Sequence, residues 1–124
     1  MSDFVHLHNH SDYSLLDAAQ TVETMCNRVA DLGMDSIAIT EHGNLFSMIP
    51  FYKAALKAGI KPIIGCEMYV AVNNHTDRQL VTLGSGKRKN YYHLVLLAMN
   101  QQGYKNLLAL TSIGYLNGFY YRPR

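Results

Sequence analysis

The chain has 124 residues, of which 48% are hydrophobic and 16% are charged, and its formal net charge is +2. A chain of this length suits a single domain, and this hydrophobic content supports a packed core, which excludes a polypeptide that is disordered throughout. A net charge of +2 is too small to indicate nucleic-acid binding by itself. A complete (β/α)8 barrel takes about 250 residues, so the chain is too short to form one.

The sequence shows no targeting segment and no disulfide framework. Its N-terminus lacks the basic start and apolar run of a signal peptide, and no stretch approaches the ~20 apolar residues of a membrane span. The two cysteines, Cys26 and Cys66, lack the CxxC spacing of cysteine-rich zinc sites. We therefore expect a soluble, cytoplasmic protein that has no membrane partner.

The first regular pattern covers residues 4–9, FVHLHN. Strict alternation places His6, His8 and His10 on one face and apolar side chains on the other, which predicts a strand. A polar loop follows at residues 11–20.

Helix and strand patterns then alternate along the chain. Three helices are predicted, at residues 22–32, 47–58 and about 101–113, and three further strands, at residues 36–40, 63–72 and 91–98. The apolar face of the second helix comprises Met48, Tyr52, Ala55 and Leu56. This alternation predicts a parallel α/β fold, interrupted by a polar loop or hairpin excursion at residues 73–90.

The His-x-His pair at the end of the first predicted strand is a candidate metal site. Side chains two residues apart on a strand lie about 7 Å apart on one face, so two such imidazoles can bind one ion or two adjacent ions. Sites in β/α folds lie at such strand ends, which makes His8 and His10 candidate ligands. The alternative is that these histidines are exposed or simply hydrogen-bonded. His6 lies deeper in the strand and is the weakest candidate of the three.

A second candidate group follows the next strand. Glu41 and His42 come directly after it and would lie beside the N-terminal histidines if the sheet is parallel. Gly43 allows a sharp turn there. The alternative is an ordinary helix entry, with Asn44 as the cap and His42 exposed.

Three further residues complete the candidate set. Glu67 lies in an apolar extended segment, where a carboxylate is costly unless it is paired or metal-bound, although it could also reach solvent at the strand end. His93 could equally be structural, and Asp17 could be an exposed turn residue. Imidazole and carboxylate ligands together suit Zn²⁺, Mn²⁺ or Fe ions, and several carboxylates favour more than one ion. Ions about 3.5–4 Å apart serve phosphoester hydrolysis.

The motifs resemble those of the PHP (polymerase and histidinol phosphatase) domain family. Its first, second and third motifs are similar to FVHLHNHSDYSLLD at residues 4–17, TEHGNLF at residues 40–46 and GIKPIIGCE at residues 59–67. Residues 92–98 and 119–124 continue the similarity, which keeps its order from residue 4 to residue 124. In this extended form the chain resembles the PHP domains at the N-terminus of bacterial DNA polymerase III alpha subunits.

The resemblance implies a fold and a ligand set. The fold is a partial, distorted (β/α)7 barrel, with residues 1–124 as the N-terminal portion, roughly the first half, of a PHP domain. The family's metal ligands fall on His8, His10, Asp17, His42, Glu67 and His93. The resemblance places Glu67 between the ions, of which a complete site holds two or three, as Zn²⁺ or Mn²⁺ with Fe as an alternative. Further family ligands, a Cys or His and an Asp-x-His, would follow residue 124. Glu41 stands where the family usually has Asp, and Ala18 where it often has Gly.

The resemblance also implies a function. The parent protein would be a DNA-directed DNA polymerase (a nucleotidyltransferase) that uses Mg²⁺, DNA and deoxynucleotides and works with other subunits of the polymerase III holoenzyme. Its PHP part would be a metal-binding, phosphoesterase-like or proofreading-related module. The chain alone lacks the polymerase's catalytic aspartates, so we expect it to be inactive, and its open barrel edge favours self-association.

Two alternatives remain open. One is a stand-alone PHP phosphatase that acts on a small phosphate ester. The other is a non-catalytic scaffold that is stabilised by metal and docks a proofreading exonuclease.

His93 presents a topological difficulty, because in strict β/α order it would begin a strand at the wrong end of the barrel. We therefore expect the chain after Glu67 to run above the barrel, turn through residues 73–90 and return antiparallel. This path would bring His93 near Glu67.

Overall fold

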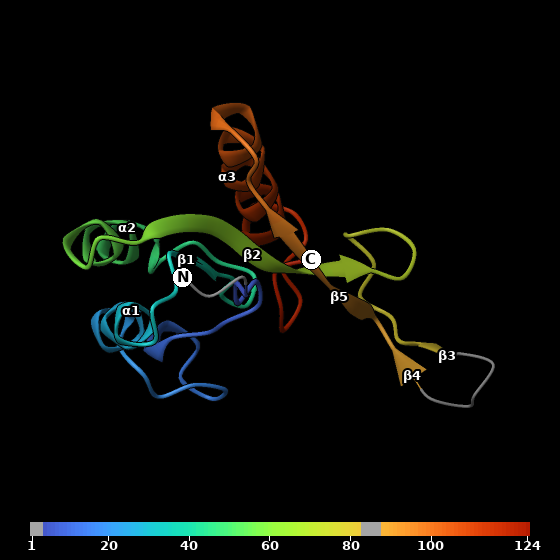
Figure 1. Cartoon of the computed structure of the whole chain (residues 1–124). Helices are drawn as coiled ribbons and strands as arrows, with labels where there is room; N and C mark the ends of the chain where they lie inside the picture. The colour runs from blue at the N-terminus through green and yellow to red at the C-terminus, as the bar shows by residue number, and fades with distance from the viewer. Residues whose placement is uncertain (1–3, 83–87) are drawn as a thin grey trace.

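A mixed sheet of three strands forms the centre of the computed structural model, which describes residues 4–82 and 88–124 (Figure 1). The strands lie in the order β1 (Ser36–Ile39), β2 (Lys61–Ala71) and β5 (Tyr91–Leu97). β1 pairs with β2 in parallel, and β2 pairs with β5 antiparallel. The predicted antiparallel return is therefore confirmed, and the prediction of a parallel sheet holds only for β1 and β2.

The prediction of a strand at residues 4–9 is wrong. This segment lies along β1, where the backbone nitrogen of Ala38 donates to the carbonyl of His6 at 2.9 Å in a single isolated bridge. The backbone nitrogen of Thr40 donates to the carbonyl of Asn9, also at 2.9 Å. Between these bonds, the side-chain amide of Asn9 donates to the carbonyls of His6 and Ala38 at 3.2 and 3.1 Å. The carbonyl of Ala38, which a regular ladder would pair with a backbone nitrogen, thus accepts from a side chain, so the segment is extended but irregular.

Helices α1 (Val22–Asp31) and α2 (Met48–Lys57) pack against each other and against β1 and β2 (Figure 1). Both confirm the sequence prediction, and each is followed by a glycine with positive φ, Gly33 (72°) and Gly59 (73°), which ends the helix. Together with β1 they form the larger core, which comprises Val22, Met25, Cys26, Val29, Ile37, Ile39, Phe51, Ala55 and Ile60.

The buried face of α2 differs from the predicted one. Of the predicted residues, Ala55 is fully buried and Met48 is half-buried, but Tyr52 and Leu56 are 47% and 55% exposed. Phe51, which was not predicted to face the core, is fully buried. Because Phe51 and Ala55 are one turn apart, they cover the same side of the helix. The neighbouring stripe is equally apolar, and the sequence pattern could not show which of the two meets the sheet.

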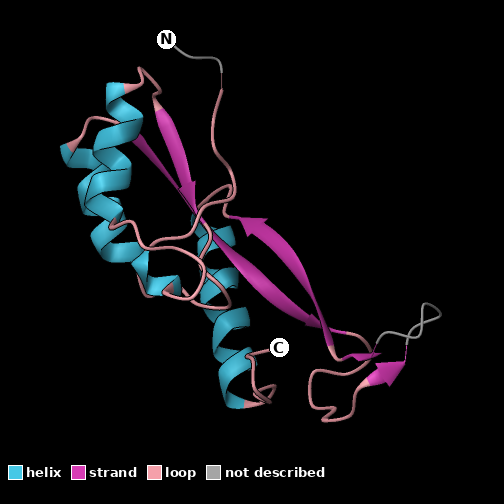
Figure 2. Cartoon of the chain, turned by 90° about the horizontal axis from the view of Figure 1, so that it is seen from below, coloured by secondary structure: helices cyan, strands magenta, loops and turns pink. Residues whose placement is uncertain are grey.

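Helix α3 (Gln101–Leu116) packs against β2 and stands apart from the other two helices (Figure 2). It is three residues longer than predicted at its C-terminal end. Asn100 caps it, since its side-chain oxygen accepts from the backbone nitrogen of Gly103 at 3.0 Å. A second, smaller core forms here from Cys66, Met68 and Leu107.

β2 and β5 continue as a two-stranded ribbon away from α1 and α2 (Figure 2). At its far end, β3 (Val81–Thr82) pairs antiparallel with β4 (Arg88–Lys89). These short strands lie within the predicted excursion at residues 73–90, of which residues 83–87 lie outside the described residues. No helix in the described ranges is long and apolar enough to cross a membrane.

Candidate metal centre

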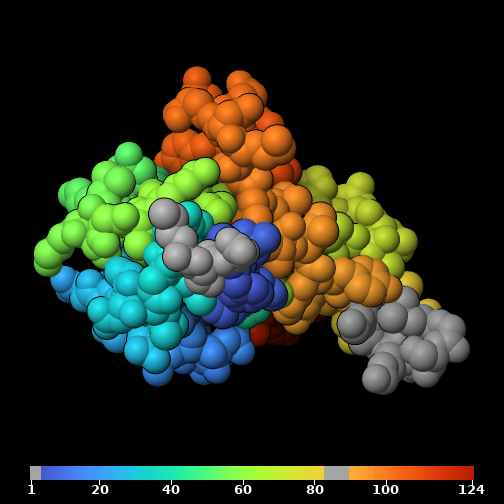
Figure 3. Space-filling model, viewed as in Figure 1, coloured from blue at the N-terminus to red at the C-terminus, as the bar shows by residue number. Residues whose placement is uncertain are grey.

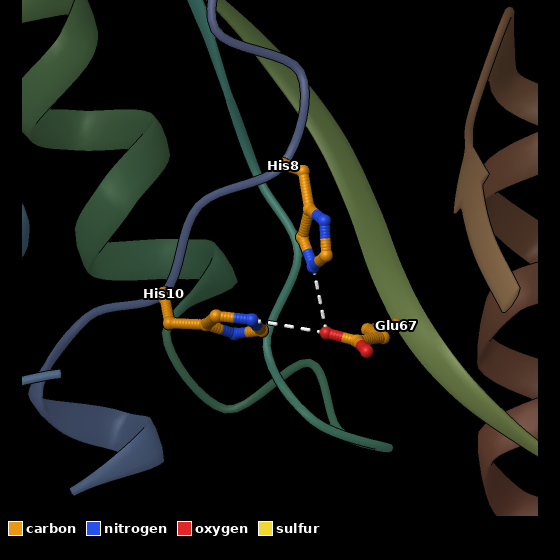
Figure 4. Close-up of side chains that lie close together, drawn as sticks. All are labelled: His8, His10 and Glu67. Atoms are coloured by element: carbon orange, nitrogen blue, oxygen red, sulfur yellow. Dashed lines mark hydrogen bonds and ion pairs between the residues drawn. The ribbon is translucent and has the colours of Figure 1, made fainter. Parts of the chain in front are cut away.

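Four imidazole side chains converge on one buried carboxylate, that of Glu67 in β2. Nε2 of His8 and Nε2 of His10 lie 2.7 and 3.0 Å from Oε2 of Glu67 (Figure 4). Nδ1 of His42 lies 3.5 Å from the same oxygen, and Nδ1 of His93 lies 2.6 Å from Oε1. The histidines therefore form two pairs that share Glu67, and the ligand atoms of each group lie within 4.8 Å of one another.

The histidines come from segments that are far apart in the sequence. His8 and His10 belong to the N-terminal segment, which lies between residues coloured cyan and orange in the space-filling view (Figure 3). His42 follows β1, and its backbone forms a parallel bridge with Glu67. His93 pairs with a residue two positions beyond Glu67 on β2, so it is a diagonal neighbour on the same face. The topology expected for His93 is thereby confirmed.

Gly43 explains how the chain turns after His42. Its φ is +62°, and its backbone nitrogen donates to the carbonyl of Glu67 at 2.9 Å. A Cβ at this position would lie 2.8 Å from Cγ of Pro123 and 2.9 Å from Cδ2 of Tyr69. Glycine is needed here both for its backbone conformation and for the close approach of these side chains.

Asp17 joins the cluster through His42. Its Oδ2 lies 2.9 Å from Nε2 of His42, and its side chain is 57% exposed, so it forms the rim of the site. The structure thus brings together all six predicted residues, five in the two groups and Asp17 beside them. His6 lies outside both groups, and its ring packs against that of Phe4 with centroids 4.8 Å apart.

Glu41 is buried behind the cluster and has hydroxyl partners. Its carboxylate accepts short hydrogen bonds from the hydroxyls of Ser11 and Ser14, at the two ends of the turn that contains η1 (Asp12–Ser14). Ser47 donates a further bond at 3.0 Å. Ser47 precedes α2 and makes no side-chain capping bond to that helix, because its hydroxyl serves Glu41.

The sequence predicted that Glu41 lies beside the histidines, but it did not predict these serines. The available signal was general: a buried carboxylate must be hydrogen-bonded, and the polar loop at residues 11–20 contains hydroxyl donors. The bonds hold that loop against the end of β1. They also place Oε2 of Glu41 4.0 Å from Nδ1 of His10, which is too far for a hydrogen bond. The backbone nitrogen of Ser11 donates to Oε1 of Glu41 at 3.1 Å, so Glu41 holds the backbone next to this imidazole.

The protonation of the cluster suits metal binding. Burial, and then the neighbouring His42, lower the pKa of His10. Burial by itself would raise the pKa of Glu67, but the hydrogen bond with His8 and the charges of His42 and His93 outweigh it, so that the pKa of Glu67 is lowered. A neutral imidazole and an ionised carboxylate are the forms that bind a cation.

Two observations test whether the residues fit a metal ion. Within the described residues, Nδ1 of His10 and Nδ1 of His42 are buried without a hydrogen-bond partner. No protein group therefore occupies these two ring nitrogens. Cys66, next to Glu67, is not a further ligand, because its thiol donates to the carbonyl of Glu41 at 3.4 Å and burial raises its pKa to about 12. The donor set is therefore imidazole and carboxylate, which fits Zn²⁺, Mn²⁺ or Fe ions.

Curated relatives carry a common name, DNA polymerase III subunit alpha. The protein from Borreliella burgdorferi is 56% identical over 99% of this chain, and that from Treponema pallidum is 47% identical over 98%. The protein from Helicobacter pylori (strain 26695) is 50% identical over 98%. The chain spans about a tenth of the length of each of these relatives.

Solved structures with low sequence identity share the fold. An amidohydrolase from Chromobacterium violaceum, solved with bound sulfate and no metal, matches with a TM-score of 0.57 and 21% identity. The match covers 88% of this chain and 34% of that one. A protein from Bifidobacterium adolescentis, described as a candidate metal-dependent phosphoesterase, matches with a TM-score of 0.51 and 14% identity over 90% of this chain and 33% of its own.

These likenesses agree with the predicted partial α/β barrel, since the chain aligns with about a third of each larger structure. The PHP domain family matches residues 6–124, which is nearly the whole chain. The resemblance that the sequence motifs indicated is confirmed, and the chain belongs to the PHP domain family.

Proposed function

We propose that the two groups around Glu67 bind divalent metal ions. His8 and His10 would hold one ion with Glu67, and His42 and His93 a second ion with the same carboxylate. Asp17 would add an exposed ligand at the rim. The proposal is supported above all by one observation, the convergence of four imidazoles from distant segments on one buried glutamate.

The chemistry proposed for this site is phosphoester hydrolysis, related to proofreading. Bound Zn²⁺, Mn²⁺ or Fe ions neutralise the charge of a phosphate ester and lower the pKa of water. The chain supplies the rest of the site. Glu67 is held by β2 and shared by both groups, and Glu41 holds the backbone next to His10 through Ser11. Asp17 is exposed at the rim, where the cluster meets solvent.

We further propose that the chain is the N-terminal part of the PHP domain of a DNA polymerase III alpha subunit. The identity of 47–56% to three such proteins supports this. The complete protein would act in DNA replication as a DNA-directed DNA polymerase, with Mg²⁺, DNA and deoxynucleotides. Its partners would be the other holoenzyme subunits, including the proofreading exonuclease, and its location would be the cytoplasm.

Metal analysis of the complete protein that carries this chain tests the first proposal. We expect His8→Ala with His10→Ala to lower the amount of bound Zn²⁺ or Mn²⁺ and to weaken hydrolysis of a single-stranded oligonucleotide. His6→Ala is the matched control, since His6 lies two residues from His8 but outside both groups. Unchanged metal content in the double variant would contradict the proposal.

The length of the gene tests the second proposal. A reading frame about ten times as long as this chain, as in the relatives, would support the polymerase subunit. A reading frame that closes soon after a complete barrel would instead support a stand-alone phosphatase. Full metal occupancy without any phosphoesterase activity would favour a scaffold.

A further inference from the structure

A cavity of about 470 Å³ lies on the face of the β2–β5 ribbon that is turned away from the candidate metal centre. Successive side chains of a strand point to opposite faces, so Met68 and Val70 project away from the side of Glu67. Leu94 pairs with Met68 and projects to the same side. Among the described residues that line the cavity there is none of the six candidate ligands. The volume lies within the range of about 300–1,000 Å³ that is usual for small-molecule sites.

Much of the cavity wall is apolar and open to solvent. It lies where α3 runs beside the ribbon (Figure 2). The apolar part of the wall comprises Met68, Val70, Leu94, Leu96, Leu110 and Ile113. Four of these side chains, those of Val70, Leu94, Leu110 and Ile113, are between 41% and 50% exposed. Hydrocarbon that covered them would remove apolar surface from water, which is favourable.

Arg124 adds a positive charge to this wall, although its side chain is only 6% exposed. Its Nε donates to the carbonyl of Gly118 at 3.2 Å, and its guanidinium carbon lies 5.6 Å from the ring centroid of Tyr120. Its Nη1 is buried without a hydrogen-bond partner among the described residues. A buried donor that lacks an acceptor is destabilising, so this nitrogen is a place for an acceptor from a ligand.

The described residues provide no carboxylate for Arg124. Neither Asp nor Glu is found in the described wall of the cavity, and no ion pair within the described ranges involves this arginine. Asp77, in the adjoining loop, instead accepts from the backbone nitrogen of Asn74 at 3.2 Å. His75 is a second residue of the wall that can carry a positive charge. The charge of the wall therefore favours an anion.

Two glycines allow Arg124 to take this position. A Cβ at Gly118 would collide with the carbonyl oxygen of Arg124 and would lie 3.3 Å from that of His75. A Cβ at Gly114 in α3 would lie 3.3 Å from the carbonyl carbon of Pro123. The backbone before the guanidinium is thus packed closely against α3 and the loop at His75, so the cation is held in place before any ligand binds.

We propose that this cavity binds a small-molecule carboxylate with a hydrocarbon body. The carboxylate would accept from Nη1 of Arg124, and the hydrocarbon would cover the apolar side chains of α3 and the ribbon. A phosphate ion could pair with the guanidinium but would leave the apolar wall uncovered. An alcohol of the same length could cover the wall but carries no charge for the guanidinium. The site is separate from the metal centre, so the inference goes beyond the proposed function and does not depend on it.

A ligand-observed NMR titration with unbranched alkanoates tests the proposal, on the complete protein that carries this chain and on the chain alone. The probes are butanoate, hexanoate and octanoate, with 1-hexanol and inorganic phosphate for comparison. We expect affinity to rise up to about fourfold with each added methylene, because each one buries apolar surface. Hexanoate should bind at least about tenfold more tightly than 1-hexanol, and phosphate should not compete with octanoate.

Two variants test the two parts of the wall. Arg124→Met removes the charge and should weaken octanoate at least about tenfold while it leaves 1-hexanol nearly unchanged. Leu110→Asn should weaken octanoate and 1-hexanol alike, about fivefold. The matched controls are Arg28→Met and Leu116→Asn, exposed positions that do not line the cavity. Leu110 is 42% exposed, so its variant should keep the melting temperature and decides the test if Arg124→Met lowers stability.

Several results would overturn the proposal. One is an affinity that does not rise with the length of the alkanoate, and another is equal affinity for hexanoate and 1-hexanol. Effects of Arg124→Met and Leu110→Asn no larger than those of their controls would do the same. Binding by the chain alone but not by the complete protein would show that another part of that protein fills the cavity, which would also contradict the proposal.

Discussion

Glu41 and Glu67 are two buried carboxylates with opposite surroundings. Glu67 faces ring nitrogens of four histidines, which are metal-ligand atoms. Glu41 faces hydroxyl groups of Ser11, Ser14 and Ser47, which are hydrogen-bond donors. The first carboxylate is thus suited to bind an ion, and the second to hold the loop and the helix around it.

We expect Glu41→Ala to reduce both stability and metal affinity. The change removes the acceptor of several buried hydroxyls, so the free energy of unfolding should fall by about 2–4 kcal/mol in a urea titration. Because the backbone of Ser11, next to His10, also loses its acceptor, Zn²⁺ affinity should fall at least about tenfold in a calorimetric titration.

The matched control is Glu23→Ala. Glu23 is exposed and pairs with the exposed Lys57 at 3.0 Å, so its removal should change stability by less than about 1 kcal/mol. If Glu41→Ala had an effect as small as Glu23→Ala, the role given to Glu41 would be wrong.

Both cysteines should be unreactive in the folded chain. Cys26 and Cys66 are free and fully buried, and burial raises the pKa of both thiols, that of Cys66 to about 12. A thiol with a raised pKa stays protonated at pH 8, and only the thiolate attacks a disulfide reagent. We expect no reaction with Ellman's reagent in the native chain and reaction of two thiols in guanidinium; prompt reaction in the native chain would show that the core opens.

At the scale of elements, the periodicity of apolar residues predicted the helices and the strands that pack against the core. It failed where a side chain takes the place of a backbone hydrogen-bond donor. The helices and the strands β1, β2 and β5 follow from apolar spacing, and glycines end α1 and α2. The segment at residues 4–9 alternates like a strand, but the side-chain amide of Asn9 donates to the carbonyls of His6 and Ala38 and interrupts the ladder of backbone bonds. The antiparallel return of β5 followed from the need to bring His93 to Glu67, not from any pattern in β5 itself.

The turn after β1 should tolerate only glycine. Gly43→Ala must adopt a φ of +62° and also displace Pro123 and Tyr69, so we expect a loss of about 2–4 kcal/mol in the free energy of unfolding. Gly33→Ala is the matched control, because Gly33 has φ +72° but no atom within 4 Å of a Cβ. Urea titrations of both variants measure the difference, and equal losses would show that the contacts at Gly43 carry no cost.

At the scale of the whole molecule, the sequence predicted the candidate metal ligands but not the residues that hold them in place. Each ligand belongs to a motif that is visible in one short segment. Ser11 meets Glu41 across 30 residues of sequence. The cavity beside Asp17 and His42 is lined by residues as distant in the sequence as Tyr13 and Tyr121. A single sequence shows local periodicity, but these contacts depend on the tertiary arrangement.

An apolar groove of about 720 Å³ between α2 and the start of α3 should promote self-association of the chain. It is lined by exposed residues that include Leu7, Ile49 and Met99. We expect sedimentation velocity to show association that rises with concentration and is abolished by Ile49→Lys with Met99→Lys. Leu116→Lys, an exposed position outside this groove, should leave it unchanged; a wild-type chain that stays monomeric at all concentrations would contradict the prediction.

The shared role of Glu67 is the central claim, and a Zn²⁺ titration with direct metal analysis tests it most directly. The unchanged chain should bind two ions, and Glu67→Gln, which keeps the shape of the side chain but not its charge, should lose both. His75→Ala, which removes a histidine outside the cluster, should bind as the unchanged chain does. Equal Zn²⁺ binding by the unchanged chain and by Glu67→Gln would contradict the account.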